Sequence, residues 1–149
     1  MRLIEYMDVG NINHWRESDT VPSAELRERI AERWPLRAEP NNYEGEVAMR
    51  YKYEDGGGEV GFISSVTEPF CGSCHRARLS SDGQLFTCLF ATSGTDLREP
   101  MRAGASDEEL AGIINKVWTR RADRYSEQRA QLIRDGREVQ KMEMYYIGG

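Results

Sequence analysis

The sequence predicts an α+β domain of small antiparallel hairpins with flanking helices. Two runs of strand-forming residues, each followed by a glycine-containing turn and a second such run, predict two β-hairpins. Two other segments carry apolar residues at helical spacing. With 149 residues, 39% of them apolar, the chain is long enough to bury a core.

The helices are predicted from periodicity and from their end signals. Segment 23–34, SAELRERIAERW, places apolar residues at four-residue steps, which predicts an amphipathic helix that ends before Pro35. Further along, Ser106 and Glu109 have the spacing of a capping box before a second apolar face. We therefore expect one helix on each side of the central hairpins.

The strands are predicted from β-favouring residues and from alternation. Residues 3–9, LIEYMDV, indicate a short buried strand, and a chain that starts inside a strand suggests that a further domain precedes it. Residues 47–53 alternate and return through EDGGG into 60–64, which predicts the first hairpin. The second hairpin joins 76–80 to 84–90 through a Ser-Asp-Gly turn.

Charge and cysteine content exclude several classes of protein. The net charge of -5 argues against a nucleic-acid binder that acts through its overall field. No segment approaches the roughly 18 apolar residues of a membrane span, and the first residues lack the apolar core of a signal peptide. We therefore expect a cytoplasmic protein that binds neither nucleic acid nor membrane. Its 3 cysteines, an odd number, indicate metal or redox chemistry rather than a disulfide framework.

The hairpin register predicts that the three cysteines converge. Cys71 and Cys74 lie in a loop just before the second hairpin, and Cys88 lies on its returning strand. Paired positions across a hairpin sum to a constant, so Cys88 is expected opposite a residue between His75 and Ala77. The third thiol is thereby brought back to the first two.

The stretch FCGSCH is compatible with several kinds of site. Three thiolates with His75 as fourth ligand would hold zinc, whereas three thiolates alone would hold a 4Fe-4S cluster with one iron open. Haem attachment normally follows export, and a thioredoxin-like pair needs a helix after the motif, so both are disfavoured. Buried cysteines that act only as small apolar residues would not explain the convergence.

Two arginines follow the cysteine loop. Arg76 and Arg78 are two residues apart on the predicted strand, so both side chains should leave the same face beside Cys74. Two guanidinium groups side by side suit bidentate binding of phosphate or carboxylate. Surface salt bridges are the other explanation of an R-x-R pair. Next to an open metal site, the pair indicates a pocket for an anionic ligand that also coordinates the metal.

These motifs resemble a known family over essentially the whole chain. The stretch IEYMDVGN at 4–11, the stretch FCGSCHRARLSSDGQLFTCLF at 70–90 and the Gly-Gly terminus resemble the C-terminal half of the GTP 3′,8-cyclase family. These radical S-adenosylmethionine enzymes start molybdenum cofactor biosynthesis. The resemblance implies that residues 1–20 are the last strand and loop of a truncated barrel. Residues 21–149 would be the iron–sulfur and GTP-binding cap that completes an incomplete α/β, TIM-like barrel.

The resemblance also implies roles for individual residues. A second 4Fe-4S cluster, whose open iron contacts the guanine of GTP, would be held by Cys71, Cys74 and Cys88. The GTP-binding R-A-R segment, in which the arginines bind phosphates, would be Arg76, Ala77 and Arg78. Met7 matches a position at the S-adenosylmethionine site, although core packing explains an apolar strand residue equally well. Arg2 would assist with phosphate, and a tail that enters the active site would end in Gly148 and Gly149.

The implied activity is that of a lyase, which converts GTP to (8S)-3′,8-cyclo-7,8-dihydroguanosine 5′-triphosphate. The C-x3-C-x2-C loop of the cluster that cleaves S-adenosylmethionine is absent from this sequence, so we expect the chain alone to be inactive. The expected partners are GTP and the missing N-terminal half, with a homodimer as a further candidate assembly. His75 stands where the family has a polar residue that is not a ligand. If it binds metal, the alternative is a stand-alone three-cysteine zinc module without catalysis.

Overall fold

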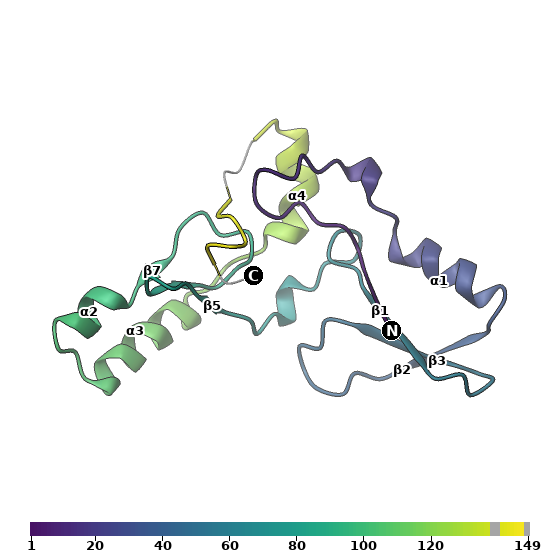
Figure 1. Cartoon of the computed structure of the whole chain (residues 1–149), viewed down its shortest axis with the longest axis horizontal. Coiled ribbons are helices and arrows are strands. Elements are labelled where there is room, and N and C mark those ends of the chain that lie inside the picture. The colour runs from purple at the N-terminus through teal and green to yellow at the C-terminus, as the bar shows by residue number, and fades with distance from the viewer. Residues whose placement is uncertain (138–140, 148–149) are drawn as a thin grey trace. The chain divides into compact units, whose positions relative to one another are not determined.

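The computed structural model describes residues 1–137 and 141–147. It divides into two compact units, each formed from two stretches of chain. Unit 1 comprises Met1–Asp8 and Trp15–His75, and unit 2 comprises Val9–His14 and Arg76–Gly149. Each unit combines a small sheet with one or more helices, which confirms the α+β class (Figure 1). The assignment of residues 1–20 to a barrel and 21–149 to a cap stays a prediction.

Unit 1 contains a four-stranded sheet in the order β1-β4-β3-β2. Its strands are β1 (Arg2–Ile4), β2 (Leu36–Glu39), β3 (Met49–Tyr53) and β4 (Glu59–Ile63). β1 runs parallel to β4, whereas β2, β3 and β4 pair antiparallel. The β3–β4 pair is the first predicted hairpin, which is confirmed. β2 was not predicted from the sequence. It forms an edge of the sheet by pairing with β3.

The core of unit 1 lies on the central strand β4. Val60 and Phe62 are fully buried there, and the Phe62 ring meets Tyr51 edge to face at 5.7 Å between centroids. The predicted helix is confirmed as α1 (Ser23–Ala31), three residues shorter than predicted. Short 3-10 turns, η1 (Glu17–Asp19) and η2 (Cys71–Ser73), complete the unit.

The described residues of unit 2 form a three-stranded antiparallel sheet in the order β5-β6-β7 and three helices. The strands are β5 (Arg78–Leu79), β6 (Gln84–Phe86) and β7 (Thr95–Asp96), and the helices are α2 (Arg98–Arg102), α3 (Asp107–Thr119) and α4 (Tyr125–Arg134). The second predicted hairpin is confirmed as β5–β6. Its turn requires glycine, because Gly83 has a φ of 86° and a Cβ there would meet Arg98.

Helix α3 begins with the predicted capping box. The Ser106 hydroxyl accepts from the Glu109 backbone N–H at 3.2 Å, and the Glu109 carboxylate accepts from the Ser106 N–H at 2.8 Å. The core of unit 2 comes from elsewhere, since Phe86, Phe90 and Ile147 are buried while α3 buries no residue. Among the described residues, no helix is long and apolar enough to cross a membrane.

Candidate functional site

The loop that carries Cys71 and Cys74 belongs to unit 1. Cys71 opens the η2 turn, and the Cys74 N–H donates to the Cys71 carbonyl at 3.3 Å, so both thiols lie on one tight turn. Both are half-buried. His75 follows and packs against Gly45, where a Cβ would lie 3.2 Å from the imidazole Nδ1. The His75 side chain is nevertheless exposed.

Cys88 belongs to unit 2, just beyond β6. The Phe90 N–H donates to its Sγ at 3.4 Å. The ladder pairs Arg78 with Phe86 and Leu79 with Leu85, so the same register, extended by two residues, puts Cys88 opposite Arg76. The predicted register is confirmed for the paired residues, but Cys88 lies two residues beyond the end of β6, so the prediction that it lies on the returning strand is wrong. The paired strands themselves end at Arg78 and Phe86.

The chemistry of the three cysteines fits a metal centre. All three lie among the described residues and none forms a disulfide, so three thiols are present as metal donors. The described residues contain no group of three His, Cys, Asp or Glu side chains that is already placed to hold a metal ion. Cys71 and Cys74 are in unit 1 and Cys88 is in unit 2, so their convergence depends on how the units come together and stays a prediction.

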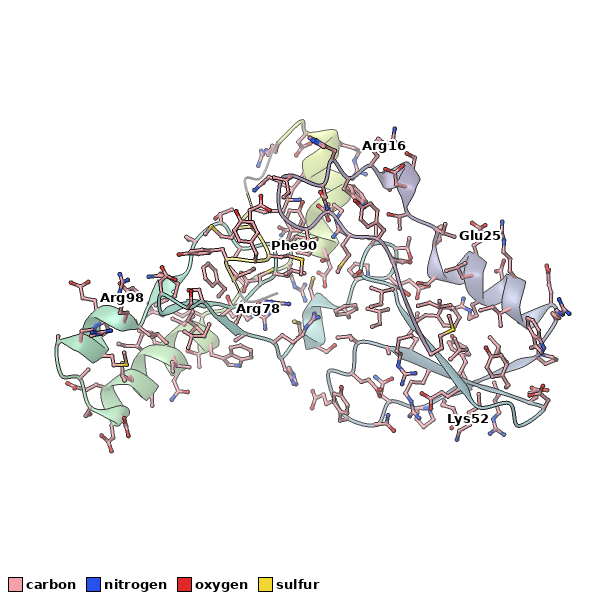
Figure 2. The ribbon with its side chains drawn as sticks, in the orientation of Figure 1. Arg16, Glu25, Lys52, Arg78, Phe90 and Arg98 are labelled. Atoms are coloured by element: carbon pink, nitrogen blue, oxygen red, sulfur yellow. The ribbon has the colours of Figure 1, made fainter. Side chains whose placement is uncertain are left out.

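The arginine pair differs from the prediction in one respect. β5 begins at Arg78, so Arg76 and Ala77 lie outside the strand, and the prediction that both arginines share a strand face is wrong. The residues opposite them, 87 and 88, follow the end of β6, so no partner strand holds this stretch extended. Arg76 is exposed. Arg78, which is labelled in Figure 2, lies on β5 and is half-buried.

Arg2 lies on β1 and makes an ion pair. Its guanidinium contacts Glu59 at 2.8 Å, and Arg50 binds the same carboxylate with two nitrogens. Hydrogen bonding by Arg50, and then by Arg2, lowers the pKa of Glu59 to about 2. A phosphate at Arg2 would therefore compete with a carboxylate that is ionised at neutral pH.

Met7 is half-buried and lies beyond the end of β1. The predicted strand over 3–9 is wrong after Ile4, because the last pairing contact with β4 is the Glu5 N–H, which donates to the Ile63 carbonyl at 3.1 Å. Packing inside a strand therefore does not explain Met7.

Glu5 is a residue that sequence reasoning missed. It is 4% exposed, and its carboxylate accepts hydrogen bonds from Ser23, Val66 and Thr67. Burial alone would raise the pKa of Glu5, but these hydrogen bonds outweigh burial and hold the pKa below its ordinary value. The available signal was an acidic side chain inside an apolar strand segment.

The predicted tail residues Gly148 and Gly149 lie outside the described residues. The segment before them, 141–147, is anchored in unit 2. Asn11 exchanges hydrogen bonds with the backbone of Lys141, and its backbone and side-chain N–H groups donate to Glu143 at 2.8 and 2.9 Å. Tyr146 donates to Asp82 at 2.7 Å, and Ile147 is fully buried. The tail is thus fixed up to the residue before the two glycines.

Comparison with known proteins identifies the family. The model named Molybdenum Cofactor Synthesis C matches residues 1–127, and the chain belongs to this family. Curated relatives named GTP 3′,8-cyclase match over the whole chain. The relative from Xanthomonas axonopodis pv. citri is 52% identical over 149 residues, which are 43% of its length. Those from Acidothermus cellulolyticus and Synechococcus sp. WH7803 are each 47% identical, with 47% and 41% of their lengths covered.

The match lies in the C-terminal part of these enzymes. The chain therefore spans less than half the length of the curated relatives that it matches.

Proposed function

We propose that the chain is the C-terminal part of a GTP 3′,8-cyclase and that it binds GTP and a second 4Fe-4S cluster. The observation that carries this proposal is 52% identity over all 149 residues to a protein of that name. In this proposal the chain serves the radical S-adenosylmethionine-dependent cyclisation of GTP to (8S)-3′,8-cyclo-7,8-dihydroguanosine 5′-triphosphate. That product belongs to molybdenum cofactor biosynthesis, the process named by the family.

The proposed role of this chain is to hold and orient the substrate. Cys71, Cys74 and Cys88 would hold the cluster as thiolates, which fits three cysteines without a disulfide. When bound, the cluster supplies an iron with an open position for an atom of the guanine. Arg76 and Arg78 would bind the phosphates through charge-assisted hydrogen bonds. Fixing both ends of GTP is catalysis by positioning.

The cleavage of S-adenosylmethionine would belong to the N-terminal half that the relatives carry. Met7 would contribute to its binding site, and the chain alone would be inactive. The edge position of β1 supports docking of that half, because Ile4 on this edge strand is 59% exposed. We propose that residues 1–20 are the last strand and loop of its barrel, and that the complete enzyme is cytoplasmic.

Metal analysis tests the cluster. The chain, purified without oxygen, should contain about four irons and four sulfides after reconstitution. Cys88→Ser should lower the iron content strongly, and His75→Asn should leave it unchanged, because in this proposal the three cysteines hold the cluster without His75. One zinc per chain without iron, lost in His75→Asn, would instead establish the zinc module.

Titration with GTP tests the arginines. Arg76→Ala and Arg78→Ala should each weaken binding of GTP to the reconstituted chain by about tenfold, whereas guanosine binding should change little. Arg37→Ala is the matched control, since Arg37 is an exposed arginine of unit 1 that pairs with Glu39. Equal losses in all three variants would show that only general positive charge matters.

A further inference from the structure

The carboxylate of Glu5 is buried and completely used by hydrogen bonds. Oε1 accepts from the Ser23 N–H at 2.8 Å and from the Thr67 hydroxyl at 2.6 Å. Oε2 accepts from the Val66 and Thr67 N–H groups at 2.8 and 2.9 Å. A carboxylate has about four acceptor positions, so each is occupied by a donor from this chain.

These bonds join three segments of unit 1. Glu5 directly follows β1, Ser23 is the first residue of α1, and Val66 and Thr67 lie in the turn after β4. That turn is closed by a hydrogen bond from the Glu68 N–H to the Ser64 carbonyl at 3.1 Å. The carboxylate therefore fixes the turn against both the strand and the helix.

The turn leads directly to the first two cysteines. Thr67 precedes Cys71 by four residues, and the η2 turn with Cys71 and Cys74 follows. On the other side, Glu5 precedes Met7 by two residues. One carboxylate thus holds the backbone that leads to both proposed parts of the site.

We propose that Glu5 is a positioning residue that sets the path of the Cys71–Cys74 loop. This role rests on the proposed function, in which Cys71 and Cys74 bind metal. Glu5 acts through Val66 and Thr67 and touches neither cysteine in this scheme. Metal binding by three cysteines is favoured when Cys71 and Cys74 are already held in place before Cys88 joins them. Glu5 provides that restraint.

This position requires a carboxylate, because all four groups that face it are hydrogen-bond donors. Glutamine has nearly the same shape, but its NH2 group would face N–H donors and leave one or two of them without an acceptor. Aspartate is one methylene shorter and cannot reach both the helix and the turn. Thr67→Val removes one of the four hydrogen bonds and keeps the shape, so it should give a smaller effect in the same direction.

The test is the alkylation rate of each cysteine in the metal-free, reduced chain, measured by mass spectrometry with iodoacetamide. Glu5→Gln should raise the rates at Cys71 and Cys74 by about fivefold or more, as expected for the loss of one buried hydrogen-bond network. Cys88 lies in unit 2 and is the internal reference. Glu25→Gln, an exposed carboxylate of α1 paired with Arg29, is the matched control and should change nothing.

The outcomes separate this proposal from the proposed function. Unchanged rates at Cys71 and Cys74 in both Glu5→Gln and Thr67→Val would overturn the role of Glu5, as would an equal rise at all three cysteines, which is general unfolding. Iron content is measured after anaerobic reconstitution on a separate, unalkylated portion of each protein. If the wild-type chain takes up no iron but the two rates still rise selectively, the cluster proposal fails while the positioning role of Glu5 stands.

Discussion

Glu59 is held by two arginines, and this carboxylate contributes to the pH dependence of the stability of unit 1. Its pKa is lowered from 4.5 to about 2, first through Arg50 and then through Arg2. A carboxylate with a depressed folded-state pKa stabilises the protein above its unfolded pKa and loses that contribution as the pH falls through the folded value. The relevant window is therefore from pH 4.5 down to about 2.

We predict that Glu59→Gln lowers the Tm at pH 6 and that the difference from wild type shrinks as the pH falls from 4.5 toward 2. Thermal unfolding followed by circular dichroism measures both curves. In an Arg50→Gln background, the Tm difference caused by Glu59→Gln should be smaller over the same pH window. Arg50 is the main cause of the lowered pKa of Glu59, and this variant removes it. A Glu59→Gln difference that stays constant over this whole window would contradict this explanation.

Gly10 combines a left-handed backbone conformation with a close neighbour. Its φ is 65°, and a Cβ would collide with the Glu143 carboxylate, which also accepts from the Asn11 N–H. We predict that Gly10→Ala lowers the free energy of unfolding by about 1–3 kcal/mol, measured by urea denaturation. Gly56→Ala is the control for backbone strain alone, since Gly56 also has a positive φ, of 80°, but no neighbour within 4 Å. Equal losses would rule out a contribution from Glu143.

In helix α3, one substitution is expected to raise the free energy of unfolding and another to lower it. Gly112 lies within this helix, and a methyl group added to it would meet no neighbour within 4 Å. We predict that Gly112→Ala raises the free energy of unfolding by about 0.5–1 kcal/mol, because alanine loses less backbone entropy on folding. A destabilising result in urea denaturation would contradict this explanation.

The N-terminus of α3 is expected to behave in the opposite way. Ser106→Ala removes the acceptor of the Glu109 N–H and should lower the free energy of unfolding by about 1 kcal/mol. Ser106→Asp restores an acceptor and should recover most of the loss. Urea denaturation of the three proteins decides between capping and a general intolerance at this position.

The elements that were predictable are those with local causes. The β5–β6 hairpin follows from Gly83, and α3 from its capping box, because both signals lie within a few residues. β2 was missed because its residues do not alternate and it forms only by pairing with β3. Glu5 was missed for the same reason, since its hydrogen-bond donors lie 18, 61 and 62 positions along the chain.

The predicted site shows the same division between local and distant causes. The register of the hairpin could be derived from the turn alone, and it is confirmed by the pairing of Arg78 with Phe86 and of Leu79 with Leu85. The extent of the strand could not be derived, because it depends on where β6 ends rather than on the residues of the R-A-R segment. The prediction was therefore right about the register but wrong in placing Arg76 and Cys88 on the paired strands, because those strands reach neither residue.

Over the full length of the chain, Asn11 joins parts that are distant in sequence. It lies 130 positions from Lys141, and the hydrogen bonds between their side-chain and backbone groups fix the segment before the C-terminal glycines. We predict that Asn11→Asp, which loses the donor and adds charge beside Glu143, accelerates amide hydrogen exchange of residues 141–147 by about tenfold or more. Asn42→Asp, in unit 1, is the control. Unchanged exchange in that segment would show that Asp82 and the burial of Ile147 hold it without Asn11.

The division of each unit into two stretches has a consequence for synthesis on the ribosome. All of unit 1 has been made once His75 is added, so its sheet can form early. The stretch Val9–His14 is made before most of unit 1, yet its partners in unit 2 follow only after Arg76. During translation this stretch therefore remains a loop without its partners while unit 1 folds. Its Gly10–Asn11 pair makes its contacts with Lys141 and Glu143 only after those residues have left the ribosome.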